Sequence, residues 1–380
     1  MAENTITSIV PDIYEALDVV SRELTGLIPA VTINTSAARA GKDQNIVVDV
    51  EPAGNGTDVT PAMTTPDPTG QTSGSKTITI NKSRAFEFGF VGEDQAKLQT
   101  GPGYMGVRAN KIAQAIRGLA NEVETDLGAL HSKFSRAFGT PTTAPFGTAN
   151  DYTDASNVLK ILKDNGSPGS DNQLVIDTSA GANFIGKQSA VNSAGTDSML
   201  RQGVLLDLAG MPLRESAQIN TPTKGTGASY TSSAAGFAVG VTAIPLITGS
   251  GTVLAGDTVT FAGDTNKYVV TTGVAAAGTI TLAEPGLRQA LAASAVALTV
   301  GATAARNMAF NRSALVLVTR APARPEEGDM ASDVMIITDP RSGLALEFSL
   351  YKGYRKVRYE VALAWGADVV KPEHTAILLG

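Results

Sequence analysis

The chain contains no cysteine and only two histidines among its 380 residues. Without cysteine there is no disulfide framework, no thiolate nucleophile and no cysteine-based zinc site. The two histidines, His131 and His374, are too few for a histidine-rich metal centre. Charged residues are also scarce, at 17% compared with about 25% in average proteins. These shortages disfavour most acid–base and metal chemistry, whereas a hydrophobic content of 43% predicts a folded chain.

Positive charge is in deficit as well. Thirty Lys and Arg against thirty-six Asp and Glu give a net charge of −6, which disfavours a protein whose main task is binding a phosphate backbone. The N-terminus lacks a basic segment followed by an apolar one, so we expect no signal peptide. No segment predicts a membrane-spanning helix. We expect a protein made in the cytoplasm, without membrane association.

Within the first ninety residues the spacing of apolar residues changes from that of a helix to that of β-strands. Apolar residues follow a helical period in residues 1–30, which predicts one amphipathic helix. Between 44 and 91, three segments alternate apolar and polar residues as half-buried strands do. They flank a tip, 52–75, that is rich in Pro, Gly, Thr and Ser and is longer than a compact domain needs. We predict that this tip contacts something outside its own domain.

A helical period then extends from residue 104 to residue 138, with charged residues off the apolar stripe. Gly139 and Pro141 supply a stop signal. At 1.5 Å per residue, about 34 residues make a rod of roughly 50 Å. We therefore predict one long helix with one face packed on a sheet or core.

The remaining chain mixes helices and strands. Residues 150–220 have the pattern of a small α/β unit. From 220 to 305, short β-like runs separated by glycine turns predict an inserted all-β barrel. After Arg306 the mixed pattern returns and includes a hairpin with one buried face. The residues predicted on that face are Leu344, Leu346, Phe348, Leu350, Val357, Tyr359, Val361 and Leu363.

Two glycine-rich segments resemble nucleotide-binding motifs. Residues 181–188, GANFIGKQ, match the spacing of a phosphate-binding loop up to the lysine, but Gln188 replaces the Ser or Thr that would bind magnesium. We favour a helical turn that buries Phe184 and Ile185. Residues 101–106, GPGYMG, have a dinucleotide-type spacing but follow a polar segment rather than a strand, so a hinge before the long helix is the simpler interpretation. We expect His131 and His374 to be surface or capping residues, without a GxSxG-type serine motif nearby.

Basic and aromatic residues interleave between 351 and 359. Strand alternation explains the charges as the solvent face of the hairpin, and the acidic remainder of the chain argues against nucleic-acid binding. We favour a charged edge that pairs with a neighbouring copy of the chain. The candidate inter-subunit contact residues are Arg39, Lys42, Asp43, Asp58, Asp67, Glu326, Glu327, Asp329, Lys352, Arg355, Lys356 and Arg358.

Several segments jointly resemble the coat proteins of the P-twenty-two group of tailed bacteriophages. They are RAFEFGF leading into a helix with LANEVETDLGAL, GDTVTFAG with ITLAEPGL, NMAFNRSALVLVTRAP, and the closing YKGYRKVRYEVALAWGADVVKPEHTAILLG. Together they span most of the chain.

The resemblance implies an α+β fold of the HK97-like capsid type. Its implied parts are an N-terminal arm helix (1–35), an extended β-hairpin loop (36–92), a peripheral domain (93–150) with a spine helix (104–138), an axial domain (151–221), an inserted β-barrel (222–305) and a return to the axial and peripheral domains (306–380).

The same resemblance implies a function. It is that of a major capsid protein, neither an enzyme nor bound to a cofactor, which assembles as hexamers and pentamers with a scaffolding protein and a portal protein. The icosahedral procapsid, formed in the host bacterial cytoplasm, would mature on packaging double-stranded DNA that it encloses without sequence-specific binding. A non-viral compartment shell and a P-loop nucleotide-binding enzyme are the alternatives.

Overall fold

The computed structural model describes residues 26–50, 58–61, 63, 74–98, 103–148, 151–187, 207–338 and 343–380. Most of the predicted N-terminal helix and of the loop tip, including Asp67, lies outside the described residues, as do the first two residues of the GPGYMG segment. No helix in the described ranges has the length and hydrophobicity needed to cross a membrane.

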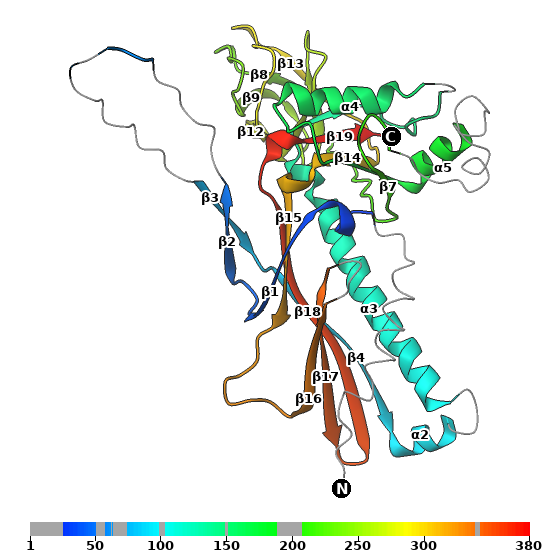
Figure 1. Ribbon diagram of the computed structural model, residues 1–380. Helices are drawn as coiled ribbons and strands as arrows, with labels where there is room; N and C mark the ends of the chain where they lie inside the picture. The colour runs from blue at the N-terminus through cyan, green and yellow to red at the C-terminus, as the bar shows by residue number, and fades with distance from the viewer. Residues whose placement is uncertain are drawn as a thin grey trace.

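One six-stranded sheet forms the elongated part of the molecule (Figure 1). Its strands, in spatial order, are β1 (Thr32–Ala40), β15 (Leu315–Pro322), β18 (Lys356–Val369), β17 (Ala345–Gly353) and β16 (Ala331–Thr338), and β4 (Lys82–Val91) also pairs with β18. The C-terminal part of β18 pairs with β15, and its N-terminal part lies between β17 and β4. The hairpin predicted from the sequence is thus the central element of this sheet.

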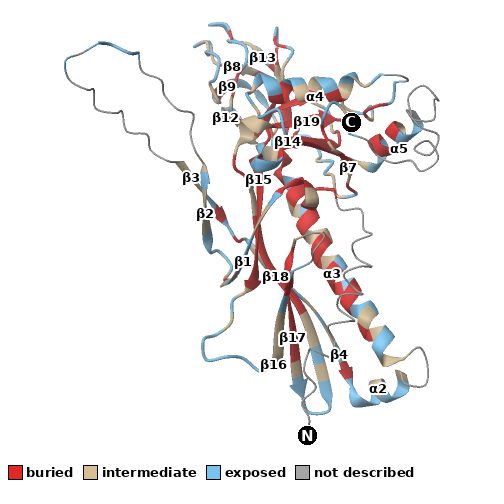
Figure 2. Ribbon diagram, viewed as in Figure 1, coloured by how far each residue is buried: buried red, intermediate tan, exposed pale blue. Residues whose placement is uncertain are grey.

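A long helix, α3 (Tyr104–Ala129), packs along β4 and β18, and its buried stripe faces the sheet (Figure 2). The stripe includes Ile112, Ile116 and Leu119, which share a hydrophobic core with Phe348 of β17. The short α2 (Gly92–Leu98) joins β4 to this region. The helix and the sheet therefore stabilise each other by burying apolar surface.

The predicted helix over 104–138 is too long. The α-helix ends at Ala129, a 3₁₀ turn, η3, covers Leu130–Lys133, and β5 covers Arg136–Phe138. β5 pairs in parallel with β19 (Thr375–Leu379) and antiparallel with β11 (Lys267–Thr272). The apolar residues after 130 fit either period, and long-range strand pairing decides between the two.

A second sheet begins at β5 and continues through β19, β14 (Arg306–Asn311), β6 (Asn172–Ile176) and β7 (Leu213–Glu215). The helix α4 (Thr153–Asp164) packs on β19, and α5 (Thr178–Lys187) follows β6. Three short 3₁₀ turns, η2 (Ile28–Ala30), η4 (Arg312–Ala314) and η5 (Pro372–His374), complete the connections. The predicted α/β pattern of this region is confirmed for its described residues.

Six further strands form the predicted barrel. They are β8 (Ala228–Ser232), β9 (Ala243–Ser250), β10 (Thr258–Phe261), β11, β12 (Gly278–Leu282) and β13 (Ala297–Val300). Each strand pairs with its neighbours, and β10 pairs with β11 to close the ring around its own apolar core. Because β11 also pairs with β5, the barrel is continuous with the second sheet.

The hairpin of β2 (Asn45–Val50) and β3 (Gly74–Thr79) diverges from the main sheet (Figure 1). At its base, Ile78 is buried in a small cluster with Val316 and Val318 of β15. Ile46, Val48 and Val50 of β2 pack against this cluster, whereas Val47 points to the other face and is 61% exposed. The hairpin is thus packed on one face and exposed on the other.

Candidate interaction surface at the hairpin tip

The turn between β17 and β18 is tight. Gly353 pairs with Lys356, so Tyr354 and Arg355 alone reverse the chain. Arg355 has φ 56°, in the left-handed region that favours glycine, asparagine and aspartate. Its carbonyl oxygen accepts the N–H of Gly92, with an N···O distance of 3.0 Å. An arginine therefore occupies a conformation that is costly for its residue type.

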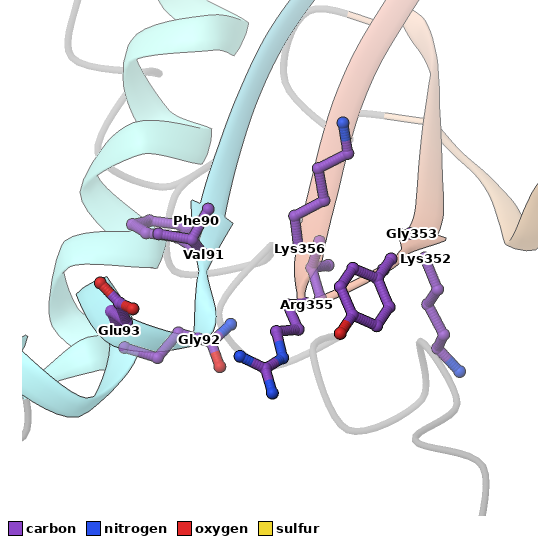
Figure 3. A pocket seen from close by; sticks show the side chains of 11 residues that line it. Phe90, Val91, Gly92, Glu93, Lys352, Gly353, Arg355 and Lys356 are labelled. Carbon is purple, nitrogen blue, oxygen red and sulfur yellow. The ribbon is translucent and has the colours of Figure 1, made fainter.

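A cavity of about 810 Å³ lies between this turn and the start of α2 (Figure 3). Phe90, Val91 and Val357 supply apolar lining, Lys352, Arg355 and Lys356 supply three positive charges, and Glu93 supplies one negative charge. We call this cavity the tip groove. The three basic residues are exposed and have no ion pair among the described residues; Arg355 lies over the ring of its neighbour Tyr354, 5.5 Å from the ring centroid. The groove therefore carries an excess of positive charge beside apolar surface.

Aromatic contacts hold the groove in place. The rings of Phe88 and Tyr359 stack at 5.3 Å, and Phe90 meets Tyr104 of α3 edge to face at 5.1 Å. The hydroxyls of Tyr104 and Tyr359 are 3.0 Å apart. Burial and this hydrogen bond raise the pKa of Tyr104, so its hydroxyl stays protonated at neutral pH. The tip groove thus rests on a sheet–helix contact made of large rings.

Three of the candidate contact residues are paired within their own chain. Arg39 and Arg324 both bind the carboxylate of Glu347, which is 3% exposed. Arg324 also binds Asp329, at 3.0 Å. Arg358 binds Glu87 and Glu360. Arg39, Asp329 and Arg358 are therefore largely neutralised before any partner arrives.

The other candidates occupy separate surfaces. Lys42 and Asp43 lie in the turn between β1 and β2, where Asp43 has φ 67°. Asp58 is exposed in the short described segment 58–61. Glu326 and Glu327 are exposed in the loop between β15 and β16, with no ion pair among the described residues. The structure thus gathers Lys352, Arg355 and Lys356 at one groove and places the other candidates elsewhere.

Two sequence expectations need correction. Strand alternation predicts that one face of the hairpin is exposed to solvent. On that face, however, Glu347 and Ser349 are buried, both 3% exposed. Arg324, which sequence reasoning did not select, binds both side chains. Glu347 and Ser349 lie 23 and 25 positions from Arg324 in the sequence, so no local sequence pattern predicts that the three side chains meet. His131 is also buried, at 4%, and its Nδ1 lies 3.0 Å from the carbonyl oxygen of Gly128, so it is a capping residue but not a surface one.

The segment that resembles a phosphate-binding loop is helical. Residues 178–187 form α5, so its glycines lie within a helix and its backbone N–H groups do not form a loop around an anion. Phe184 is buried, as expected, whereas Ile185 is 38% exposed. The P-loop alternative is therefore wrong. No cluster of three potential metal ligands occurs among the described residues.

No protein-family model and no curated protein matches this chain. Solved structures do match it. The chain is 11% identical to the protein in the capsid structure of the cyanophage P-SCSP1u, covering 92% of this chain and 86% of that one, with a TM-score of 0.49. It is 11% identical to the capsid protein of the Myoviridae phage XM1, covering 94% of this chain and 92% of that one, with a TM-score of 0.45. It is 10% identical to the protein of the virus-like particle from Pyrococcus furiosus, covering 96% of each chain, with a TM-score of 0.40.

The structural neighbours are tailed-phage capsid proteins and related particles. Among them are capsid proteins of the wider tailed-phage type that the sequence resemblance implied. At 10–12% identity the likeness concerns the fold and assigns no partner or location to this chain.

Proposed function

We propose that this protein is a non-enzymatic shell subunit, the major capsid protein of a tailed double-stranded DNA bacteriophage. The supporting observation is apolar and charged surface that the chain leaves uncovered on elements reaching away from its cores. Val47 is 61% exposed, Val59 97% and Met63 106%, all between β1 and β3. Surface of this kind is completed by contact with other copies.

The proposal includes the finer steps implied by the resemblance. Copies would form hexamers and pentamers, with a scaffolding protein and a portal protein, in the bacterial cytoplasm. The shell would enclose DNA in the virion without sequence-specific contacts, which agrees with the net charge of −6. We also propose the divisions given above: arm 1–35, extended loop 36–92, peripheral part 93–150 and axial part 151–221, barrel 222–305 and return 306–380.

Electron microscopy of the purified chain tests the proposal. We expect closed shells of uniform diameter, formed by the chain alone or with its scaffolding protein. Nuclease-protected DNA within particles from infected cells would support the phage capsid, whereas an enclosed enzyme would support the non-viral compartment instead. A monodisperse monomer at high concentration, with and without the scaffolding protein, would overturn both.

A deletion addresses the extended loop directly. Removal of residues 52–75 takes away Gly74 and Ser75 but leaves four of the six described β2–β3 pairs and the cluster at the hairpin base. We therefore expect a folded subunit with an unchanged circular dichroism spectrum that no longer forms shells. Deletion of the exposed barrel turn 275–277, which lies far along the chain from β2 and β3 and spares the Val253–Val274 bridge, serves as the control. Normal shells from the 52–75 deletion would contradict the role given to this loop.

A further inference from the structure

The tip groove and the loop between β15 and β16 are complementary in charge. The groove holds three exposed basic residues without ion-pair partners among the described residues. The loop, 325–330, carries the exposed Glu326 and Glu327, and Met330, whose side chain is 84% exposed. An acidic segment with one large apolar side chain matches a groove in which three basic residues outnumber Glu93 and in which Phe90, Val91 and Val357 form an apolar floor.

The loop is held ready for such a contact. Asp329 Oδ1 accepts hydrogen bonds from Arg324 Nη1 at 3.0 Å and from the N–H of Ala331 at 2.9 Å. Arg324 is fixed in turn by the buried Glu347. These contacts fix the C-terminal end of the loop and leave Glu326, Glu327 and Met330 exposed, which lowers the entropy lost when a partner binds them.

The backbone conformation of Arg355 also favours a contact with another subunit. Glycine would occupy the left-handed position without cost, yet the chain places a long cationic side chain there. Within its own chain, the only described contact of this guanidinium is with the ring of Tyr354, which is itself 88% exposed. The strain therefore has no compensating ion pair among the described residues, which favours a use for the side chain outside the subunit.

Both surfaces lie at the same end of the elongated sheet. Asp329 and Met330 line a second cavity, of about 460 Å³, together with Lys352 and Lys356. A groove and a loop of opposite charge on one chain can be satisfied together when the groove of one copy binds the loop of another, either reciprocally about a two-fold axis or head to tail.

We propose that the tip groove of one subunit binds the 325–330 loop of a neighbouring subunit, with Glu326 and Glu327 against Lys352, Arg355 and Lys356 and with Met330 on the apolar floor. This inference rests on the proposed function and specifies one of its subunit contacts. It assigns the groove to a second copy of this chain rather than to nucleic acid.

Charge exchange provides the first test. We expect the R355E/K356E chain and the E326K/E327K chain each to reduce shell yield at least tenfold, and the chain with all four substitutions to recover most of it. Lys160→Glu, an exposed lysine on α4, is the matched control and should assemble normally. If the unmodified chain assembles and both double variants assemble equally well, this inference is wrong while the proposed function stands. If the unmodified chain never assembles, the proposed function itself has failed.

Engineered cysteines provide the second test, because the chain has none of its own. Shells would be formed from an equal mixture of Arg355→Cys and Glu327→Cys chains and then oxidised. We expect a disulfide-linked heterodimer on a non-reducing gel. Each single-cysteine chain alone should stay unlinked. Linkage of Arg355→Cys chains to one another would show a tip-to-tip contact and overturn the proposal. So would binding of duplex DNA by the subunit that is lost in R355E/K356E while the shell yield is unchanged.

Discussion

Glu124 of α3 binds the backbone N–H of Leu27 at 2.6 Å, across 97 positions of sequence. The same carboxylate accepts the N–H groups of Gly26 and Ile28 and the hydroxyl of Ser216. Glu124 is fully buried. One side chain of the long helix therefore fixes both the start of the described chain and the segment after β7.

Replacing this carboxylate should be costly. Glu124→Ala leaves three buried N–H groups without an acceptor, so we expect the free energy of unfolding to fall by about 3 kcal/mol or more. Glu124→Gln retains one acceptor oxygen and should lose less. Glu122→Ala, which removes only a partly exposed ion pair with Arg84, is the control and should change stability little. Urea unfolding of the three variants measures this ranking, and equal losses for Glu124→Ala and Glu122→Ala would contradict it.

Three glycines of α3 differ in the space around them. A Cβ at Gly106 would meet no atom within 4 Å, one at Gly118 would lie 2.7 Å from the Phe86 ring, and one at Gly128 would lie 2.6 Å from the backbone oxygen of Gln218. Gly106→Ala should therefore stabilise the protein by about 0.5 kcal/mol through reduced backbone entropy in the unfolded chain. Gly118→Ala should destabilise it, and Gly128→Ala more so because backbone cannot move aside. Thermal midpoints in a different order would show that the helix packs differently.

Stability should depend on pH through His131. Burial lowers the pKa of His131 below 6.5, and the positive charge of Arg306 acts in the same direction. The unfolded chain then binds a proton more readily than the folded one, so this contribution is complete above about pH 6.5 and is lost as the pH falls below it.

The variant His131→Gln isolates that contribution. Between pH 7.5 and 5.5 its free energy of unfolding should fall less than that of the unmodified chain. Burial also lowers the pKa of His374, so part of the dependence persists in this variant. Equal falls for the two proteins in urea titrations would show that His131 binds protons equally well in both states.

The sequence predicts elements whose signal is local. Alternation identifies the hairpin of β17 and β18, and the glycine-spaced runs identify the barrel. The end of α3 is missed because Phe134 and Phe138 are apolar at a spacing that suits a helix, whereas residues 136–138 form β5, which pairs with β19 and β11. Local period cannot report a partner strand that lies more than a hundred residues away.

The same limit applies to the candidate surface. Lys352, Arg355 and Lys356 are adjacent in sequence and can be recognised together, and the structure places them on one groove. Arg39 and Glu347 are 308 positions apart, so their pairing needs the parallel contact of β1 with β15, which brings Arg39 opposite Ala321. Arg39 is therefore predicted from the sequence to be free for a contact between subunits, although in the folded chain it pairs with Glu347.

The side chain of Arg306 is fully buried, and its Nε, Nη1 and Nη2 atoms have no hydrogen-bond partner in the described part of the chain. Burial lowers its pKa, since the guanidinium loses its hydration. Arg306→Met keeps most of the volume and removes the desolvated charge, so we expect stability to rise by about 1 to 4 kcal/mol.

Arg136 is the matched control for that substitution. It is buried too, but its Nη1 donates to Asn266 at 2.8 Å and its Nη2 to Asn165 at 3.1 Å. Arg136→Met should therefore lower stability by about 2 kcal/mol, because charged hydrogen bonds are lost and their acceptors lose a donor. Urea midpoints of the two methionine variants should move in opposite directions. A loss at Arg306 as large as that at Arg136 would mean that its guanidinium is paired in solution, most directly with Asp257, whose charge raises the pKa of Arg306.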